Sequence, residues 1–418
     1  MNLAAATRRE FLIVLALWLL VFASSSQTMI IAPILPVVGG ELAIEAGLLG
    51  TLVSAYSLTV GLAAVLAGPV SDRVGRRRIL LMGAGLMTVA LLLHGLVVGY
   101  GSFLVVRALA GVAGGILSGA AVSYVGDYFP YTRRGWATGW VMTGTAAGQI
   151  AGIPVGVVLA GAMGFRVPFY LFGALMGLTF LLMWLRVPQP AGKVSRKPLT
   201  LRRFVGEYRG LLAQREIRAA MGSYFLIFLG LSIYAVYLPT WFEQDLGAST
   251  NQIALLFLAG GVASVLVGPQ AGRLSDRLGR KGMILGSCLG LGALMVATTP
   301  VVREPWVGYP FFFMIMALVA MRIGPFSALL TALVPDARRG TLLSFCVALG
   351  QVGFAVGAAV AGVLYAHYGY ASATLAAATS VVAMGLLVWW RIPEPLGDVE
   401  GSEGTPSAEG VDRSSRPG

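Results

Sequence analysis

The chain has 418 residues, of which 57% are hydrophobic and only 11% are charged, and its mean hydropathy is +0.81. Soluble domains carry about 25% charged residues, so this composition excludes a soluble protein and indicates an integral membrane protein. The net charge of +12 would suggest nucleic acid binding only in a soluble chain, and no nucleic acid partner is expected here.

The first apolar run follows Arg8 and Arg9 and continues to about Val38. The two arginines and the serines at 24–26 resemble an export signal. The run is longer than the apolar region of such a signal, which is 7–15 residues. We therefore interpret residues 11–38 as a first membrane-spanning helix with its arginines at the cytoplasmic end.

Eleven further runs are long enough to span a membrane, since a helix needs about 20 apolar residues to cross the hydrocarbon core. The twelve predicted spans are 11–38, 47–69, 79–99, 102–125, 135–161, 166–186, 219–242, 250–271, 282–301, 307–333, 341–366 and 371–391. No alternation typical of strands competes with them, so the predicted fold class is an all-α integral membrane protein. Two six-helix halves, 1–186 and 219–392, flank a basic linker at 187–218, and a disordered tail follows at 393–418.

Basic residues concentrate in every second loop, which predicts the orientation because cytoplasmic loops are rich in Lys and Arg. The basic loops contain Arg8, Arg9, Arg73, Arg76, Arg77, Arg78, Arg133, Arg134, Arg273, Arg277, Arg280, Lys281, Arg338, Arg339 and the arginines and lysines of 187–218. The opposite loops contain only Arg166 and Arg303. Both termini are therefore expected in the cytoplasm.

The later part of the linker, 199–218, could form a basic helix on the inner leaflet.

The loop after the second span is repeated in the second half. It reads Gly68-x3-Asp72-Arg73-x-Gly75-Arg76-Arg77, and its copy reads Gly272-x3-Asp276-Arg277-x-Gly279-Arg280-Lys281. Asp72 and Asp276 are 204 residues apart, and later motifs repeat at 205. Glycine permits a tight turn, and in a helical turn Asp72 and Arg76 would lie within side-chain reach. A loop that only fixes topology would need no acidic residue.

The fourth span contains Arg107-Ala-Leu-Ala-Gly111-x2-Gly114 and ends near Asp127. An arginine at the bilayer centre costs about 2.5–3.5 kcal/mol on insertion scales. Arg107 therefore has a function inside the membrane, or its side chain extends to the outer interface. Both alternatives remain open at this stage.

The fifth span contains Gly148, Gly152, Pro154 and Gly156. At the corresponding places the second half keeps Gly353 and Gly357 but has Ala359 instead of proline. Proline at 154 is thus not needed merely to build the fold. A Gly/Pro run would bend this helix at the seam between the halves, although close helix packing is an alternative.

Other polar residues inside the spans are Gln27, Tyr234, Tyr237 and Arg322. Arg322 lies near the middle of its span. It either has a functional role or stabilises the structure by pairing with backbone carbonyls. His94 and His367 lie near span ends and are expected at the interface. No Asp or Glu lies deep in any predicted span, and neither a disulfide nor a metal or cofactor site is expected.

These motifs resemble those of the major facilitator superfamily, over about residues 10–392. In that family, the loop motif bridges the two halves in the outward-facing state, and Asp127 matches the acidic partner of the motif arginine. The Arg107 segment resembles the signature of proton-coupled members, and the resemblance makes Arg107 and Asp127 the candidates for proton coupling. The Gly148–Gly156 segment resembles the exporter signature imperfectly, because Ile153 intervenes before the proline and Val157 replaces a glycine.

The resemblance implies a secondary transporter of the twelve-span drug:proton antiporter branch and not an enzyme. Spans 1, 4, 7 and 10 line the family's cavity, which makes Gln27, Arg107, Tyr234, Tyr237 and Arg322 the candidate substrate residues. The expected activity is proton-coupled export of small amphipathic compounds, neutral or anionic, from a monomer in the bacterial inner membrane. An exporter of sugars or other metabolites and a lipid flippase are the alternatives.

Overall fold

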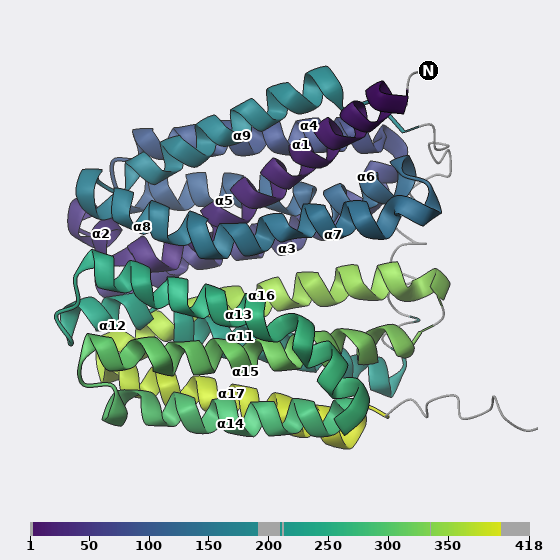
Figure 1. The fold of residues 1–418 in the computed structure, drawn as a ribbon. Helices are drawn as coiled ribbons and strands as arrows, with labels where there is room; N and C mark the ends of the chain where they lie inside the picture. Colours follow the sequence, from purple (N-terminus) through teal and green to yellow (C-terminus); the bar gives the residue numbers. More distant parts are fainter. Residues whose placement is uncertain (1–2, 191–209, 211–212, 335, 394–418) are drawn as a thin grey trace, which may run out of the picture.

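The computed structural model describes residues 3–190, 210, 213–334 and 336–393. Over these residues the chain is helical and has no strand, which confirms the all-α fold class. Figure 1 shows two bundles, one above the other, with the first half in purple to teal and the second in green to yellow. Within the described residues, twelve helical spans are long and apolar enough to cross a membrane, at the places predicted from the apolar runs.

The first bundle is built from the helices up to residue 186. They are α1 (Leu3–Met29), α2 (Ile31–Leu42), α3 (Ala46–Val74), α4 (Arg76–Leu93) with the 3-10 turn η1 (His94–Leu96), α5 (Tyr100–Leu117), α6 (Ala120–Tyr128), α7 (Tyr131–Ala147), the π-helical turn η2 (Gly148–Gly152), α8 (Ile153–Met163) and α9 (Arg166–Arg186).

The second bundle is built from the helices after residue 214. They are α11 (Arg215–Ala235), α12 (Leu238–Gln244), α13 (Thr250–Leu278), α14 (Arg280–Val301), α15 (Pro305–Ala332), α16 (Asp336–Tyr368) and α17 (Tyr370–Arg391). The predicted surface helix at 199–218 lies mostly outside the described residues, and its last part, from Arg215, is the first turn of α11. The predicted tail also lies outside them, except for its first residue.

The first and seventh spans are interrupted rather than continuous. The first breaks between α1 and α2 at Ile30, and the seventh breaks between α11 and α12 after Ala235. Proline explains both breaks, because its ring clashes with the preceding turn and it donates no backbone hydrogen bond. Pro33 and Pro36 follow the first break, and Pro239 follows the second. The interruptions lie 206 residues apart, close to the displacement of the internal repeat.

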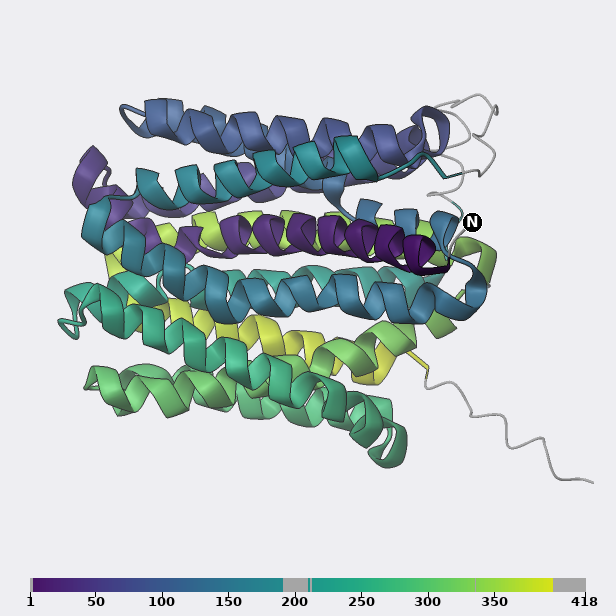
Figure 2. The same cartoon turned by 45° about the horizontal axis from the view of Figure 1, so that its top comes forward.

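The two bundles touch along α3 and α16, along η2 and α8 against α13, and between α2 and α12. Glycines allow the closest approaches. A methyl group on Gly50 would overlap the carbonyl of Ala358, and one on Gly61 would lie 3.0 Å from the Ala348 oxygen. Ser54 Oγ donates to the Ala355 carbonyl at 2.6 Å across this seam. Toward the end that carries the basic loops, α7 and α13 diverge in both views (Figures 1 and 2).

Candidate functional site

Tyr237 forms hydrogen bonds between the two bundles at the end opposite to the basic loops. It lies just after the break in the seventh span and is fully buried. Its hydroxyl donates to the Ala46 carbonyl at 2.7 Å and accepts from the Gly50 amide at 2.9 Å, both at the start of α3. The ring also stacks on Tyr365, with centroids 5.2 Å apart. A side chain of the second half thus bonds directly to the backbone of the first.

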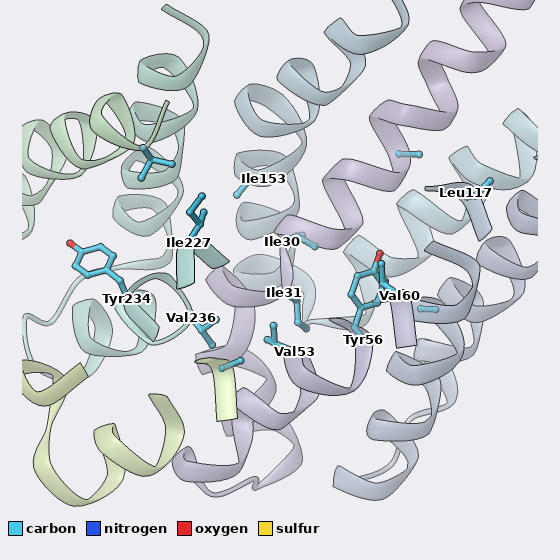
Figure 3. Close-up of a cluster of buried hydrophobic side chains, with 14 of the residues drawn as sticks. Ile30, Ile31, Val53, Tyr56, Val60, Leu117, Ile153, Ile227, Tyr234 and Val236 are labelled. Atoms are coloured by element: carbon cyan, nitrogen blue, oxygen red, sulfur yellow. The ribbon is translucent and has the colours of Figure 1, made fainter. Parts of the chain in front are cut away.

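The middle of the seam is apolar. Figure 3 shows Ile31, beside the first break, close to Val53 of α3 and to Val236, which follows α11. Ile227 and Ile153 lie near them from the two halves, and all five are buried. Because the two interrupted helices meet here through apolar side chains, the middle of the seam can separate without breaking an ion pair between these residues.

A hydrogen-bonded group of three side chains lies beside the first break. Gln27 Nε2 donates to the Tyr56 hydroxyl at 3.0 Å and to Thr28 Oγ1 at 2.8 Å. The two hydroxyls are 2.7 Å apart, and Thr28 donates to the Ser24 carbonyl at 2.8 Å. Gln27 is fully buried, and its Oε1 has no hydrogen-bond partner among the described residues.

Arg107 adjoins this group. Its guanidinium carbon lies 4.3 Å from the centre of the Tyr56 ring. The side chain is fully buried, so it does not extend to the outer interface. Its three guanidinium nitrogens have no hydrogen-bond partner in the part of the chain that the structure describes. The arginine is therefore held by a cation–π contact and by packing.

His94 lies in the interior and not at the interface, so the sequence-based prediction for this residue is wrong. The turn η1 extends α4 and places the imidazole between two rings, 3.9 Å from Phe169 in a stacked arrangement and edge-on to Phe103 at 5.4 Å. Nδ1 donates to the Ala90 carbonyl at 2.8 Å. Nε2 has no partner among the described residues, and Arg107 is close enough to interact electrostatically.

Arg322 and Tyr234 lie inside the second bundle, apart from the Arg107 group. Arg322 is fully buried beside the Cys288 thiol of α14, and that thiol contacts the Met384 sulfur of α17 at 3.5 Å. The Tyr234 hydroxyl is 3.2 Å from Thr298 Oγ1. Thus the five candidate substrate residues do not form one cluster. Two lie in the first half, two in the second, and Tyr237 lies on the seam.

The first copy of the repeated loop is tied to its own half. Arg76 Nε donates to Asp127 Oδ2 at 2.6 Å, and Arg76 Nη1 donates to Ser71 Oγ at 2.8 Å. Arg77 donates to the Trp184 and Val187 carbonyls, both at 2.7 Å, at the end of α9. These contacts join spans 2, 3, 4 and 6 at the basic end.

Gly75 and its counterpart Gly279 have positive φ angles of 97° and 85° between two helices, a conformation that glycine adopts without strain. Arg73 and Arg277 are exposed, and Gly272 and Arg280 are partly buried. The surroundings of Gly68 and the side chains of Asp72 and Asp276 lie outside the described parts.

The glycines of the fifth span face α1. Methyl groups on Gly148 and Gly152 would meet Ser26, and one on Gly156 would overlap Ile30. Pro154 is the second residue of α8, just after η2, and prolines and π-helical turns are both recognised causes of a bend in a helix. On its other side η2 meets α13, where the Gln149 carbonyl lies 3.2 Å from a methyl group placed on Gly261. The motif therefore connects the interrupted first span to the second half.

Sequence reasoning missed Thr28, Ser54 and Tyr56, which the structure places at the seam or beside Arg107. A hydroxyl in an apolar run carries no signal of its own. The prolines after the two breaks were a usable signal in the sequence. Helix interruptions at matching places in two repeated halves indicate a transporter binding site.

Comparisons with known proteins agree with this architecture. The model of the Major Facilitator Superfamily matches residues 17–218 and 220–414. The chain is 28% identical over 385 residues to the multidrug resistance protein MdtG of Proteus mirabilis, covering 89% of this chain and 94% of the relative. It is 26% identical over 359 residues to the uncharacterized MFS-type transporter YceJ of Bacillus subtilis, covering 84% and 90%.

Two solved structures share the fold. A crystal structure of a D-xylose–proton symporter superposes with a TM-score of 0.76 at 22% identity, covering 92% of this chain and 98% of that one. A bacterial homologue of the human lysosomal transporter Spinster superposes with a TM-score of 0.72 at 16% identity, covering 92% and 95%.

Proposed function

The chain belongs to the major facilitator superfamily and is a multi-pass transporter of small molecules in the inner membrane, and we propose that it exports small amphipathic compounds in exchange for protons. The observation that carries this proposal is the asymmetry of the seam. Tyr237 and the α3–α16 contact join the halves at one end, whereas α7 and α13 diverge at the other (Figure 2). Alternating access requires two such ends that open in turn.

The choice of amphipathic cargo follows from the lining of the seam. Ile31, Val53 and Val236 are buried apolar side chains where the interrupted helices meet (Figure 3), and they would present an apolar lining once the seam opens. The predicted spans carry no deep Asp or Glu, so nothing in them attracts a lipophilic dication. Similarity to multidrug resistance proteins named MdtG adds support for export of this kind.

The direction of opening follows from the charges. Positively charged loops remain in the cytoplasm, so the divergent end faces the cytoplasm and the Tyr237 end faces outward. In this orientation both termini are cytoplasmic. The arrangement is then the one that loads cargo from inside, as an exporter must.

For the coupling proton, we assign Asp127 as the titrating group, paired with Arg76 at the cytoplasmic end. The test is transport in proteoliposomes under an imposed pH gradient, for the unchanged protein and for Asp127→Asn. We expect the gradient to drive transport by the unchanged protein and not by the variant. A gradient without effect on the unchanged protein would replace proton exchange with another driving force. Full gradient-driven transport by Asp127→Asn would refute only the role of that residue.

The cargo class is tested separately, in an efflux-deficient host with and without the gene. We expect the gene to lower the toxicity of amphipathic compounds. If it instead lowers sugar accumulation, or if vesicles show headgroup transport of labelled lipid, the exporter of metabolites or the flippase replaces the drug-type exporter.

A further inference from the structure

Arg107 is a buried positive charge without a counter-ion among the described residues. Its side chain is fully enclosed, and its Nε, Nη1 and Nη2 have no hydrogen-bond partner there. An arginine remains charged at any working pH. A buried ion is costly unless it is paired and hydrogen-bonded. The feature therefore needs a partner that the described residues do not supply.

The geometry around Arg107 leaves its hydrogen-bond donors available. Tyr56 covers the face of the guanidinium at 4.3 Å, and a cation–π contact of this kind uses the face of the group. The donors of a guanidinium lie in its plane, in a fork that matches a carboxylate. Gln27 and Thr28 both hold the Tyr56 hydroxyl, so the ring that supports the arginine is fixed in place.

The neighbouring polar groups supply no negative charge. His94 uses Nδ1–H for the Ala90 carbonyl, so its neutral form presents only a lone pair at Nε2. Gln27 Oε1 is a neutral acceptor that no described residue hydrogen-bonds. The unpartnered groups among the described residues at this place are thus one charged donor and two neutral acceptors. A bound group with an anionic oxygen would neutralise the donor.

The place is close to the proposed transport pathway. Tyr56 is three residues after Val53 on α3, and Figure 3 shows it beside the break at Ile30 and Ile31. Tyr56 is therefore about one helical turn along α3 from Val53 at the seam, and it lies beside the interrupted first span. A cargo molecule between the halves can reach this position when the seam opens.

We propose that Arg107, supported by Tyr56, Gln27 and Thr28, is an anion site that binds the carboxylate of an amphipathic cargo molecule. This assignment rests on the proposed export function for the statement that the anion is part of the cargo. A free inorganic anion shares the chemistry that Arg107 recognises, and the experiment separates the two sources.

The experiment measures anion binding by the purified full-length protein in lipid nanodiscs, through its thermal unfolding temperature in a sodium HEPES buffer of low ionic strength that contains neither chloride nor a carboxylate. Sodium benzoate serves as the carboxylate probe, and sodium chloride is titrated in parallel. We expect saturable stabilisation by benzoate, absent from Arg107→Gln and at least tenfold weaker in affinity in Arg107→Lys, which keeps the charge but not the planar fork. The matched control is Arg391→Gln, which removes an exposed arginine at the end of α17 and should bind benzoate normally.

The unfolding temperature of Arg107→Gln without benzoate or chloride distinguishes a ligand site from a residue with only a structural role. If Arg107 is an unpaired buried charge, its removal should leave the unfolding temperature equal to or higher than that of the unchanged protein. If Arg107 stabilises the fold, its removal should lower the unfolding temperature. Saturation by chloride alone, abolished in Arg107→Gln, would keep the anion site but refute the carboxylate cargo. Equal benzoate responses in the unchanged protein and Arg107→Gln would overturn the proposal. Benzoate binding without gradient-driven export would instead refute the proposed function and leave the site intact.

Discussion

Tyr237, like Ser54, has a hydroxyl that bonds to the backbone of the other half. Replacement by phenylalanine keeps the ring and its stacking on Tyr365 but removes the bonds to Ala46 and Gly50. A typical hydrogen bond contributes about 0.5–1.5 kcal/mol net. We expect Tyr237→Phe to shift the population of the sealed end by about 2- to 10-fold per bond toward the separated form.

The shift is measured as the distance between spin labels on Leu48→Cys and Ser249→Cys, which lie at this end in the two halves. The native cysteines Cys288 and Cys346 are buried and should not react. The matched control is Tyr365→Phe, since that hydroxyl bonds Gln244 and Asp245 within its own half. An unchanged distance distribution in Tyr237→Phe, or an equal change in the control, would contradict the role of the Tyr237 hydroxyl.

At the same scale, the sequence identified which residues are unusual but not what surrounds them. Arg107 stands out because a charge inside a span is rare. Its support by Tyr56 depends on which faces of α3 and α5 meet, and a single apolar sequence does not specify that. His94 was misplaced for a related reason. Nearness to the end of a span suggests an interface, whereas here Phe103 and Phe169 enclose the ring.

At the scale of elements, the small size of glycine allows α3 and α16 to approach each other closely. A methyl group on Gly50 would overlap the Ala358 carbonyl, whereas one on Gly286 of α14 would meet nothing within 4 Å. Overpacking typically costs about 1–3 kcal/mol, while alanine in an open helical position is favoured over glycine by about 0.5–1 kcal/mol. We expect Gly50→Ala to separate the sealed end and Gly286→Ala to leave it unchanged.

The same pair of spin labels, at Leu48 and Ser249, reports both substitutions. Thermal unfolding in nanodiscs provides a second readout, and there Gly286→Ala should be as stable as the parent or more stable. If Gly50→Ala leaves the distance distribution as it is in the parent, the close α3–α16 contact does not hold the seam.

The spans themselves were predictable, because lipid imposes a minimum apolar length and requires every backbone group to bond within its own helix. The interruptions at Ile30 and after Ala235 were not predicted, although Pro33, Pro36 and Pro239 mark them in the sequence. An apolar run reads as one helix whether or not it bends. Only the comparison of the two halves shows that both runs break at matching positions.

At the scale of the whole molecule, the orientation follows from the unequal charge of the two ends. Arg8, Arg76, Arg133 and their neighbours lie at one end, and only Arg166 and Arg303 at the other. Translocation of basic loops is disfavoured. Two exposed positions test this. Tyr131 begins α7 at the basic end and is 85% exposed. Ser249 precedes α13 at the opposite end and is also exposed.

We expect a membrane-impermeant thiol reagent added to intact cells to label Ser249→Cys and not Tyr131→Cys. After the membrane is made permeable, both should react. The parent chain is the control and should stay unlabelled, because Cys288 and Cys346 are buried. Labelling of Tyr131→Cys in intact cells would reverse the orientation. The divergent end would then face outward, and the loading of cargo from the cytoplasm would have to be abandoned together with the cytoplasmic position of Asp127.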